Sequence, residues 1–330
     1  MPPQLLPYEL MSLRLTVNEH AFRAHVAHTV GSTPGLIPVV KGNGYGLGRP
    51  FLVQLVSELL GPTQAVAVGT VFEAQDIPTS TPVYILTPIG EFDQVAIPVN
   101  AIPTVATERD LTVLQSKGWK SPVVVKLASP MQRFGVEAPD FLALVQHISA
   151  AGLTIHSCAL HLPLHHTDEE IYEQLSKWIP LVPQCVTVSL SHVSATQLAA
   201  QQEKFPDALF EVRLGTALWH GDKSFFSLHT EVLAVHSIAK GTTAGYHSTA
   251  APADGHIVVV AAGTAHGVAP LANGSSPFHF QQQRLTLLEA PYMHSAMCFV
   301  PLGQPCPKIG DAIDVQRPLH SVAPDITLWV

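Results

Sequence analysis

The chain has 330 residues, of which 47% are hydrophobic, so it exceeds one ordinary domain and can bury a large core. Its formal net charge of −8 and the lack of a basic run argue against nucleic acid as a partner. The four cysteines have no CxxC spacing, no apolar run is long enough to span a membrane, and the N-terminus lacks a signal-peptide pattern. We therefore expect a soluble, cytoplasmic protein that does not bind membranes.

Eight near-continuous apolar runs rich in Val, Ile and Ala follow one another along the first two thirds of the chain. They are 36–41, 64–70, 82–87, 101–106, 122–128, 153–162, 185–193 and 208–215. Such runs are typical of parallel strands that are covered on both faces. Segments of helical pattern lie between them, namely Pro50–Leu60, Glu108–Lys117, Ala138–Ala151 and Thr167–Trp178. Eight βα units in roughly 200 residues predict a closed TIM-type (β/α)8 barrel, although an open doubly wound sheet is an alternative that periodicity does not exclude.

The two ends of the chain have different patterns from the barrel. Val17–Thr29 is predicted to form an extra helix before the first strand. From about residue 224, runs such as Thr230–Ile238, Ile257–Ala262 and Ala312–Val315 are separated by turns rich in Gly, Pro and His. This pattern predicts a small all-β domain. We therefore expect a barrel domain at 1–223 and a C-terminal β-domain at 224–330.

Lys41 ends the first apolar run and is followed by the loop Gly42-Asn43-Gly44-Tyr45-Gly46-Leu47-Gly48. Desolvation at the end of a buried strand lowers the pKa of a lysine and leaves an amine that can attack an aldehyde. The glycines let backbone N–H groups approach an anion, and Tyr45 adds a hydroxyl. These are the requirements of a pyridoxal phosphate site, but an ordinary lysine that reaches solvent before a turn fits the segment equally well.

The segment Val39–Gly48 resembles the pyridoxal-lysine signature of the alanine racemase family, the fold-type III pyridoxal-phosphate enzymes, with Gly42 and Gly44 where alanines are common. The resemblance implies pyridoxal 5'-phosphate as the cofactor, Lys41 as the Schiff-base lysine and Tyr45 as a phosphate ligand. It also implies a barrel followed by a β-domain that completes the active site of the partner subunit.

The segment Lys126–Gly135 is similar to a second motif of the family, although Ala128, Ser129 and Pro130 replace its aspartate, threonine and glycine. The match implies that Arg133 faces the substrate carboxylate, as suits a planar bidentate donor. Lys126 matches a lysine that is carbamylated in some members, and a simple buried charge is the alternative.

Further matches follow the later strands. His161 matches the histidine that stacks on the cofactor. Together with His165, His166 and Asp168 it could instead suggest a metal site. No second cluster supplies the remaining ligands, so we expect no metal. The resemblance implies that Ser194, Gly215 and Thr216 bind the phosphate and that Arg213 meets the pyridine nitrogen. An arginine keeps its proton, which leaves that nitrogen unprotonated and favours racemisation over transamination. Glu211 lies on the same strand face as Arg213 and could pair with it.

In the β-domain, Tyr246 matches the second catalytic base of the family, and Met293 matches a residue whose backbone N–H binds the substrate carboxylate. The family's tyrosine and aspartate are replaced at Thr264 and His266, and a further aspartate is replaced by His294. The chain ends at Val330, so the family's late segment is expected to be missing.

We therefore predict an amino-acid racemase that works as a head-to-tail homodimer and uses Lys41 and Tyr246 as its two bases. One alternative is a decarboxylase or lyase of the same fold. Another is a degenerate homologue that binds pyridoxal phosphate, or nothing, without catalysis. The sequence does not identify the amino acid that is the substrate.

Overall fold

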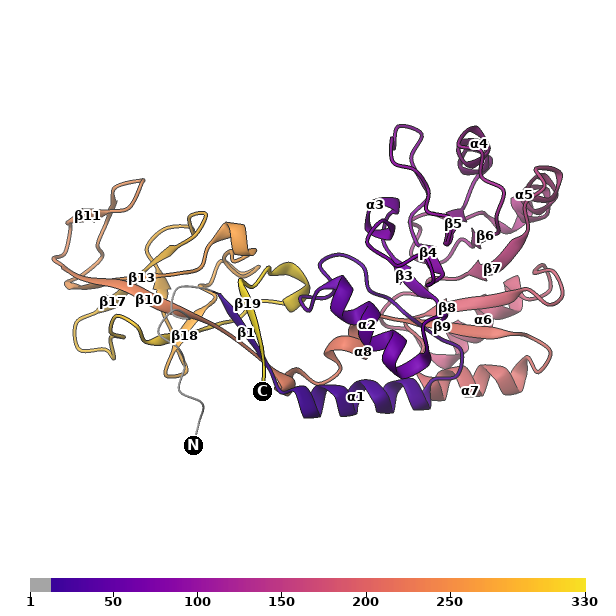
Figure 1. Cartoon of the computed structure of the whole chain (residues 1–330). Coiled ribbons are helices and arrows are strands. Elements are labelled where there is room, and N and C mark those ends of the chain that lie inside the picture. Colours follow the sequence, from indigo (N-terminus) through magenta and orange to yellow (C-terminus); the bar gives the residue numbers. More distant parts are fainter. Residues whose placement is uncertain (1–12) are drawn as a thin grey trace. The chain divides into compact units, whose positions relative to one another are not determined.

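Figure 1 shows a computed structural model of the protein, which describes residues 13–330. The described chain divides into two units: residues 25–221 form one, and residues 13–24 together with 222–330 form the other. The predicted boundary between residues 223 and 224 lies close to the end of the first unit. Residues 13–24, which precede the barrel, belong to the second unit. The prediction had assigned them to the barrel domain.

The first unit is built on an eight-stranded parallel sheet, and each predicted apolar run contains one of its strands. The strands are β2 (Leu36–Pro38), β3 (Val66–Val68), β4 (Val83–Ile85), β5 (Ala101–Val105), β6 (Val123–Lys126), β7 (Ile155–Ala159), β8 (Thr187–Ser191) and β9 (Phe210–Leu214). Their order is β2-β9-β8-β7-β6-β5-β4-β3, and a parallel bridge from Val39 to Ala67 joins the first strand to β3. The sheet is therefore a nearly closed (β/α)8 barrel, as predicted.

Helices follow the barrel strands and lie outside them (Figure 1). They are α2 (Arg49–Leu60), α3 (Val71–Ala74), α4 (Glu108–Ser116), α5 (Ala138–Ala150), α6 (Asp168–Trp178), α7 (Ala195–Lys204) and α8 (Thr216–His220). The four helices predicted from the sequence are confirmed. Thr107, Thr167 and Ser194 begin α4, α6 and α7 with reciprocal capping boxes, which satisfy backbone N–H groups that have no partner inside the helix.

The N-terminal helix was predicted to begin at Val17, but α1 spans Glu19–Ser32 and a strand, β1 (Arg14–Val17), precedes it. Val17 pairs with Phe226 of β10 in an antiparallel ladder. Asn18 then accepts a hydrogen bond from the backbone N–H of Ala21 (3.0 Å), which is typical of a residue that starts a helix. The strand was not recognised because four residues give too short a pattern to distinguish from the start of the helix.

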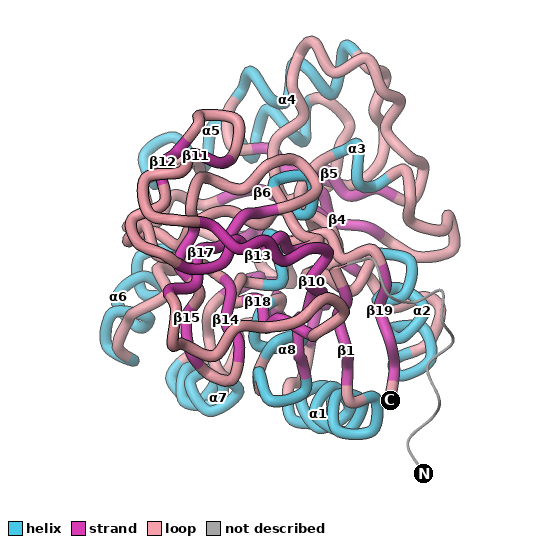
Figure 2. Tube along the Cα trace, turned by 90° about the vertical axis from the view of Figure 1, so that its left-hand side faces the viewer, coloured by secondary structure: helices cyan, strands magenta, loops and turns pink. Residues whose placement is uncertain are grey.

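The second unit is a mostly antiparallel sheet, whose strands are joined by long loops (Figure 2). The sheet order is β15-β14-β18-β10-β13-β17-β16, and β1 pairs with both β10 and the terminal β19. Its strands are β1, β10 (Phe226–Ile238), β13 (Gly255–Val260), β14 (Phe278–Phe280), β15 (Gln283–Arg284), β16 (Thr286–Leu287), β17 (Ala296–Pro301), β18 (Ala312–Val315) and β19 (Ile326–Trp329). A separate hairpin joins β11 (Thr243–Ala244) to β12 (Thr249–Ala250), and the short helical turns η1 (Lys223–Phe225), η2 (Thr264–His266) and η3 (Leu319–Ser321) complete the unit. The predicted β-domain is confirmed.

Candidate active site

Lys41 lies at the C-terminal end of the first barrel strand, and buried contacts hold the backbone before it. The N–H of Val39 donates to Leu214 (2.8 Å) and the N–H of Val40 donates to Ala67 (2.8 Å), so the strand is bonded on both sides. The indole of Trp219, which is fully buried, donates to the carbonyl of Val39 (2.7 Å). The lysine therefore extends from a fixed backbone at the edge where barrel active sites form.

The loop after Lys41 brings Tyr45 against the end of the last strand. Gly44 has φ +64°, and a Cβ there would lie 2.3 Å from the carbonyl carbon of Gly48, so the turn requires a glycine. Tyr45 is buried and has φ +57°. A Cβ added to Gly215 would lie 1.9 Å from the hydroxyl of Tyr45, which shows how closely that hydroxyl approaches the backbone after β9. The structure thus brings together two of the predicted phosphate-binding residues.

We expect Gly215→Ala to displace the side chain of Tyr45 and to lower the free energy of unfolding by about 1–3 kcal/mol, because the methyl group overpacks the site. The affinity for inorganic phosphate or pyridoxal phosphate should fall as well. Urea unfolding and equilibrium dialysis measure the two effects. Gly31→Ala is the control, because no atom lies within 4 Å of its Cβ position; equal effects at both positions would contradict the close contact.

Four cationic side chains influence one another at this end of the barrel. Burial lowers the pKa of Lys41, and the positive charges of Arg133 and Arg213 lower it further, whereas Glu73 opposes them. Lys126 is buried at the end of β6, and its burial, together with the same two arginines, holds its pKa well below the usual value. Both amines are therefore neutral at a lower pH than free lysine. A neutral amine is the nucleophilic form.

Arg133 is carried by a loop that folds back on the end of β6. The N–H of Ala128 donates to Val136 (3.0 Å), and the N–H of Val136 donates to Lys126 (2.8 Å). Gly135 has φ +150°, and a Cβ there would lie 2.5 Å from the backbone of Leu127 and Ala128, so this close return requires a glycine. The guanidinium of Arg133 is exposed and lies 4.7 Å from the centre of the Phe134 ring.

His161 follows β7 and contacts residues from the next strand. Its Nδ1 lies 2.5 Å from the hydroxyl of Ser191, and its ring centre lies 4.6 Å from that of His192. Burial lowers the pKa of His161 to about 2, with further lowering by the charges of Lys126 and Arg213. The ring is therefore neutral at physiological pH, as an imidazole that packs against another ring should be.

This lowered pKa predicts an acid-dependent loss of stability. The unfolded chain binds a proton at His161 below about pH 6.5, whereas the folded chain does not until about pH 2. The contribution of His161 to stability is therefore full above pH 6.5 and falls as the pH decreases below it. We expect the cofactor-free His161→Asn variant to take up as much as about one proton fewer per molecule than the wild type when it unfolds at pH 5. Unchanged uptake would contradict a neutral His161.

Arg213 is buried in β9 and donates from Nη2 to the carbonyl of Leu160 (3.0 Å). Burial lowers its pKa to about 10, so it stays protonated at neutral pH. Glu211 is not its hydrogen-bond partner; the hydroxyl of Tyr84 donates to Glu211 Oε2 (3.2 Å), and His156 Nε2 lies 2.7 Å from that hydroxyl. Glu211, which the sequence allowed as a partner of Arg213, acts on it through its charge, which raises the pKa of Arg213, while its carboxylate accepts the hydrogen bond of Tyr84.

The remaining predicted phosphate ligands lie at helix starts. Ser194 precedes α7, and its hydroxyl accepts from the backbone N–H of Gln197 (3.1 Å), which leaves the hydroxyl hydrogen available. Thr216 is exposed at the first position of α8. The positive ends of helices favour anions.

In the second unit, Tyr246 and Met293 are both exposed, with 84% and 66% of their surfaces accessible. Tyr246 lies at the tip of the hairpin between β11 and β12. The segment that contains Thr264 pairs with that of Met293, because the N–H groups of Thr264 and Ala265 donate to Tyr292 (2.7 Å) and Met293 (2.8 Å).

Sequence reasoning missed several neighbours of these residues. Ser191 and His192 lie just before Ser194 in the chain. Their contact with His161 becomes visible only when β7 and β8 are seen side by side in the structure. Glu73 follows β3 and acts electrostatically on Lys41 and Tyr45. No sequence signal connects it to them.

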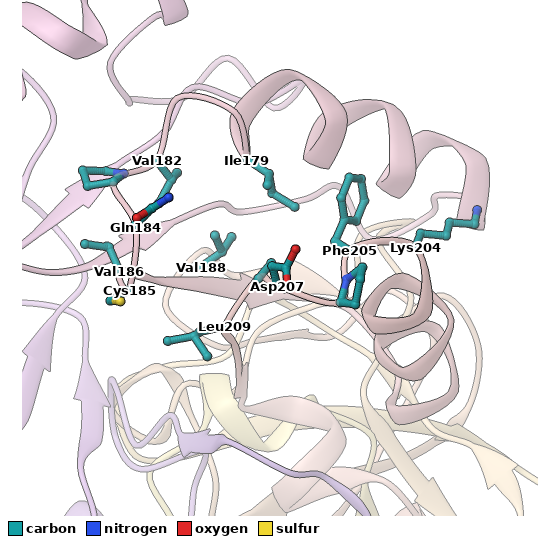
Figure 3. Close-up of a pocket in the computed structure, with 13 residues that line it drawn as sticks. Ile179, Val182, Gln184, Cys185, Val186, Val188, Lys204, Phe205, Asp207 and Leu209 are labelled. Carbon is teal, nitrogen blue, oxygen red and sulfur yellow. The ribbon is translucent and has the colours of Figure 1, made fainter.

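A cavity of about 340 Å³ lies at the opposite end of the barrel, where β8 and β9 begin (Figure 3). Apolar side chains such as Val182, Val188 and Leu209 line it. It contains none of the predicted site residues. Within residues 13–330, no group of three His, Cys, Asp or Glu side chains is placed to hold a metal ion, and no helix has the length and apolar character to cross a bilayer.

A (β/α)8 barrel with a lysine at the end of its first strand, together with an antiparallel β-unit, has the architecture of the fold-type III pyridoxal-phosphate enzymes. The family profile described as "Alanine racemase, N-terminal domain" matches residues 15–223. The chain therefore belongs to the alanine racemase family.

Solved structures of alanine racemases share the fold at low identity. The Bartonella henselae structure with covalently bound pyridoxal phosphate has a TM-score of 0.73 and 17% identity, and the alignment covers 97% of this chain and 99% of that one. The biosynthetic enzyme of Pseudomonas aeruginosa has a TM-score of 0.69 and 19% identity, and the alignment covers 97% of this chain and 100% of that one. The enzyme of E. faecalis has a TM-score of 0.69 and 19% identity, covering 94% and 90%. No curated protein sequence matches the chain significantly.

Proposed function

We propose that the protein is a pyridoxal-phosphate-dependent amino-acid racemase that works as a head-to-tail homodimer. The observation that carries the proposal is Lys41, an amine of lowered pKa at the mouth of the barrel, close to the charges of Arg133 and Arg213. The family to which the chain belongs supports the cofactor, because its solved members include one with covalently bound pyridoxal phosphate.

The residues present fit this cofactor. The lowered pKa of Lys41 suits an amine that condenses with an aldehyde. Because Gly215 has no side chain, the Tyr45 hydroxyl lies directly against the backbone after β9, which puts a hydroxyl beside the start of α8. Tyr45, Ser194, Gly215 and Thr216 would hold the phosphate.

Two further residues would hold the ring of the cofactor, with His161 against its face and Arg213 at its nitrogen. When bound, pyridoxal phosphate supplies an electron sink that makes the α-proton of the amino acid removable.

The side chains of the protein would move the proton and orient the substrate. Lys41 Nζ would take the α-proton as the neutral amine, or return one as the ammonium, on one side of Cα. The hydroxyl of the partner subunit's Tyr246 would act on the other side, because inversion requires a group on each face. Arg133 orients the substrate carboxylate with charge-assisted hydrogen bonds, together with the backbone N–H of the partner subunit's Met293. Because burial and the two arginines hold the pKa of Lys126 well below its usual value, they favour the neutral amine, which is the form that can react with CO₂; the carbamate formed with loss of one proton would place a negative charge beside Arg133.

The test incubates cofactor-loaded protein with single enantiomers of a panel of amino acids in deuterated water. We expect the opposite enantiomer to form with deuterium at Cα. Carbon dioxide or an aldehyde as the product would instead indicate a decarboxylase or a lyase. A cofactor-loaded protein that incorporates no α-deuterium into any amino acid would contradict racemase activity.

A further inference from the structure

Tyr246 lies at the tip of the β11–β12 hairpin, in the four-residue turn from Gly245 to Ser248. The N–H of Ser248 donates to the carbonyl of Gly245 across the turn (3.2 Å). The side chain of Tyr246 is 84% exposed. A loop tip of this kind is normally mobile, whereas a proton-transfer group must be held in a defined position.

Glu289 fastens this turn from outside the hairpin. Its Oε1 accepts hydrogen bonds from the backbone N–H of His247 (3.2 Å) and from the hydroxyl of Thr249 (3.1 Å). Its Oε2 accepts from the hydroxyl of Tyr292 (2.9 Å). These bonds outweigh the effect of burial and keep the pKa of Glu289 below its ordinary value. A single carboxylate therefore connects both sides of the turn to Tyr292.

Tyr292 in turn contacts Tyr246 directly. The ring centres are 4.5 Å apart with an interplanar angle of 39°, which is within the range of favourable aromatic pairs. The backbone N–H of Tyr246 donates to the hydroxyl oxygen of Tyr292 (3.4 Å). The hydroxyl of Tyr292 donates within this unit, to Glu289 Oε2 (2.9 Å) and toward Met297 Sδ (3.2 Å), whereas Tyr246 is exposed. Of these two phenols, that of Tyr246 is therefore the one placed to exchange a proton with a substrate.

The backbone at Gly245 fits the same arrangement. It has φ +83°, and a Cβ there would lie 2.1 Å from Glu289 Oε1 and 2.7 Å from the hydroxyl of Tyr292. Only a glycine allows the turn to approach the carboxylate this closely. The hairpin, Glu289 and Tyr292 thus form one packed unit, although 40 or more positions separate the hairpin residues from their partners along the chain.

From this geometry we propose that Tyr292 and Glu289 are positioning residues that hold the phenol of Tyr246 for proton transfer. The proposal rests on the proposed function, in which Tyr246 is one of the two acid–base groups. Tyr292 supplies the packing surface and an acceptor for the backbone of Tyr246, and Glu289 fixes Tyr292 and the turn together.

The experiment compares the cofactor-loaded full chain with Tyr292→Leu, which removes the ring, and with Glu289→Gln. The glutamine has a single acceptor oxygen, so it can accept from Tyr292 or from the turn at His247 and Thr249, but not from both. Tyr172→Phe is the matched control, because Tyr172 stacks on Phe205 in the barrel unit, away from the hairpin. We expect kcat to fall about tenfold to a hundredfold in both variants with KM changed less than about twofold, since a small misplacement of a reacting group is costly. The α-deuterium isotope effect should increase for one enantiomer only, whereas a general loss of folded protein would leave both isotope effects unchanged.

A second measurement does not depend on activity. In protein labelled with ¹³C-tyrosine, the ring signal of Tyr246, assigned with Tyr246→Phe, should carry a ring-current shift from Tyr292. Tyr292→Leu should move that signal to the position of an exposed tyrosine. An unmoved signal, or kinetic effects no larger than those of Tyr172→Phe, would overturn the positioning role. If the wild type does not racemise any amino acid, the proposed function fails, while the NMR signal still decides whether Tyr292 positions Tyr246.

Discussion

Lys41→Ala is expected to abolish racemisation, with a decrease in kcat on the order of 10³-fold or more, because the variant loses both the covalent attachment point and one proton-transfer group. The visible absorbance of the cofactor-loaded protein should also disappear. Chiral chromatography and absorbance spectroscopy measure the two effects. Lys120→Ala removes an exposed lysine of the same unit and should change neither.

This prediction separates the racemase from its alternatives. A degenerate homologue that binds pyridoxal phosphate without catalysis would lose its absorbance in Lys41→Ala but would have no activity to lose. A variant that keeps both the absorbance and the activity of the wild type would show that another amine holds the cofactor. Because Lys126 is also buried with a lowered pKa, it is the amine to examine next.

Tyr246→Phe is expected to lower kcat for racemisation by about 10²- to 10⁴-fold, which is the usual contribution of a general acid–base group. The binding of the cofactor should remain, since Lys41 and the phosphate ligands belong to the barrel. Exchange of the α-proton should survive for the enantiomer whose proton is taken by Lys41. The measurement is deuterium incorporation at Cα without inversion, monitored by NMR. If both enantiomers lost exchange equally, Tyr246 would not act on one face alone.

Mixing the two inactive variants tests whether Tyr246 acts in the partner subunit. A heterodimer of Lys41→Ala with Tyr246→Phe has one barrel that retains Lys41 and faces an intact tyrosine. After subunit exchange, an equal mixture should recover about one quarter of wild-type activity, because half of the dimers are mixed and half of their sites are intact. If Tyr246 acted within its own subunit, mixing would restore no activity.

The barrel could be predicted because its strands are buried on both faces. Runs such as Val123–Lys126 and Phe210–Leu214 consist mainly of apolar residues because they are buried, and the regular spacing of such runs predicts the (β/α)8 order. The roles of Arg133, His161 and Arg213 came from the resemblance to family motifs; these motifs follow or end strands of a parallel barrel, whose C-terminal ends share one face.

Other features depend on tertiary contacts that leave no local pattern. β1 forms because Arg14–Val17 pairs with β10, more than 200 positions away. The contact of Glu289 with the Tyr246 hairpin likewise joins distant segments, and an isolated glutamate in a loop resembles any solvated charge. Glu211 could pair with Arg213 because they share a strand face, but the hydrogen bond to its carboxylate comes from Tyr84 of β4, a strand that is not next to β9 in the sheet.

The most direct test of the account is borohydride reduction of the cofactor-loaded protein, followed by digestion and mass mapping. Reduction fixes a pyridoxyl group on the amine that holds it. We predict one modified peptide, with the added mass on Lys41. A modified peptide that contains Lys126 or any other lysine, or the absence of a modified peptide, would contradict the central claim.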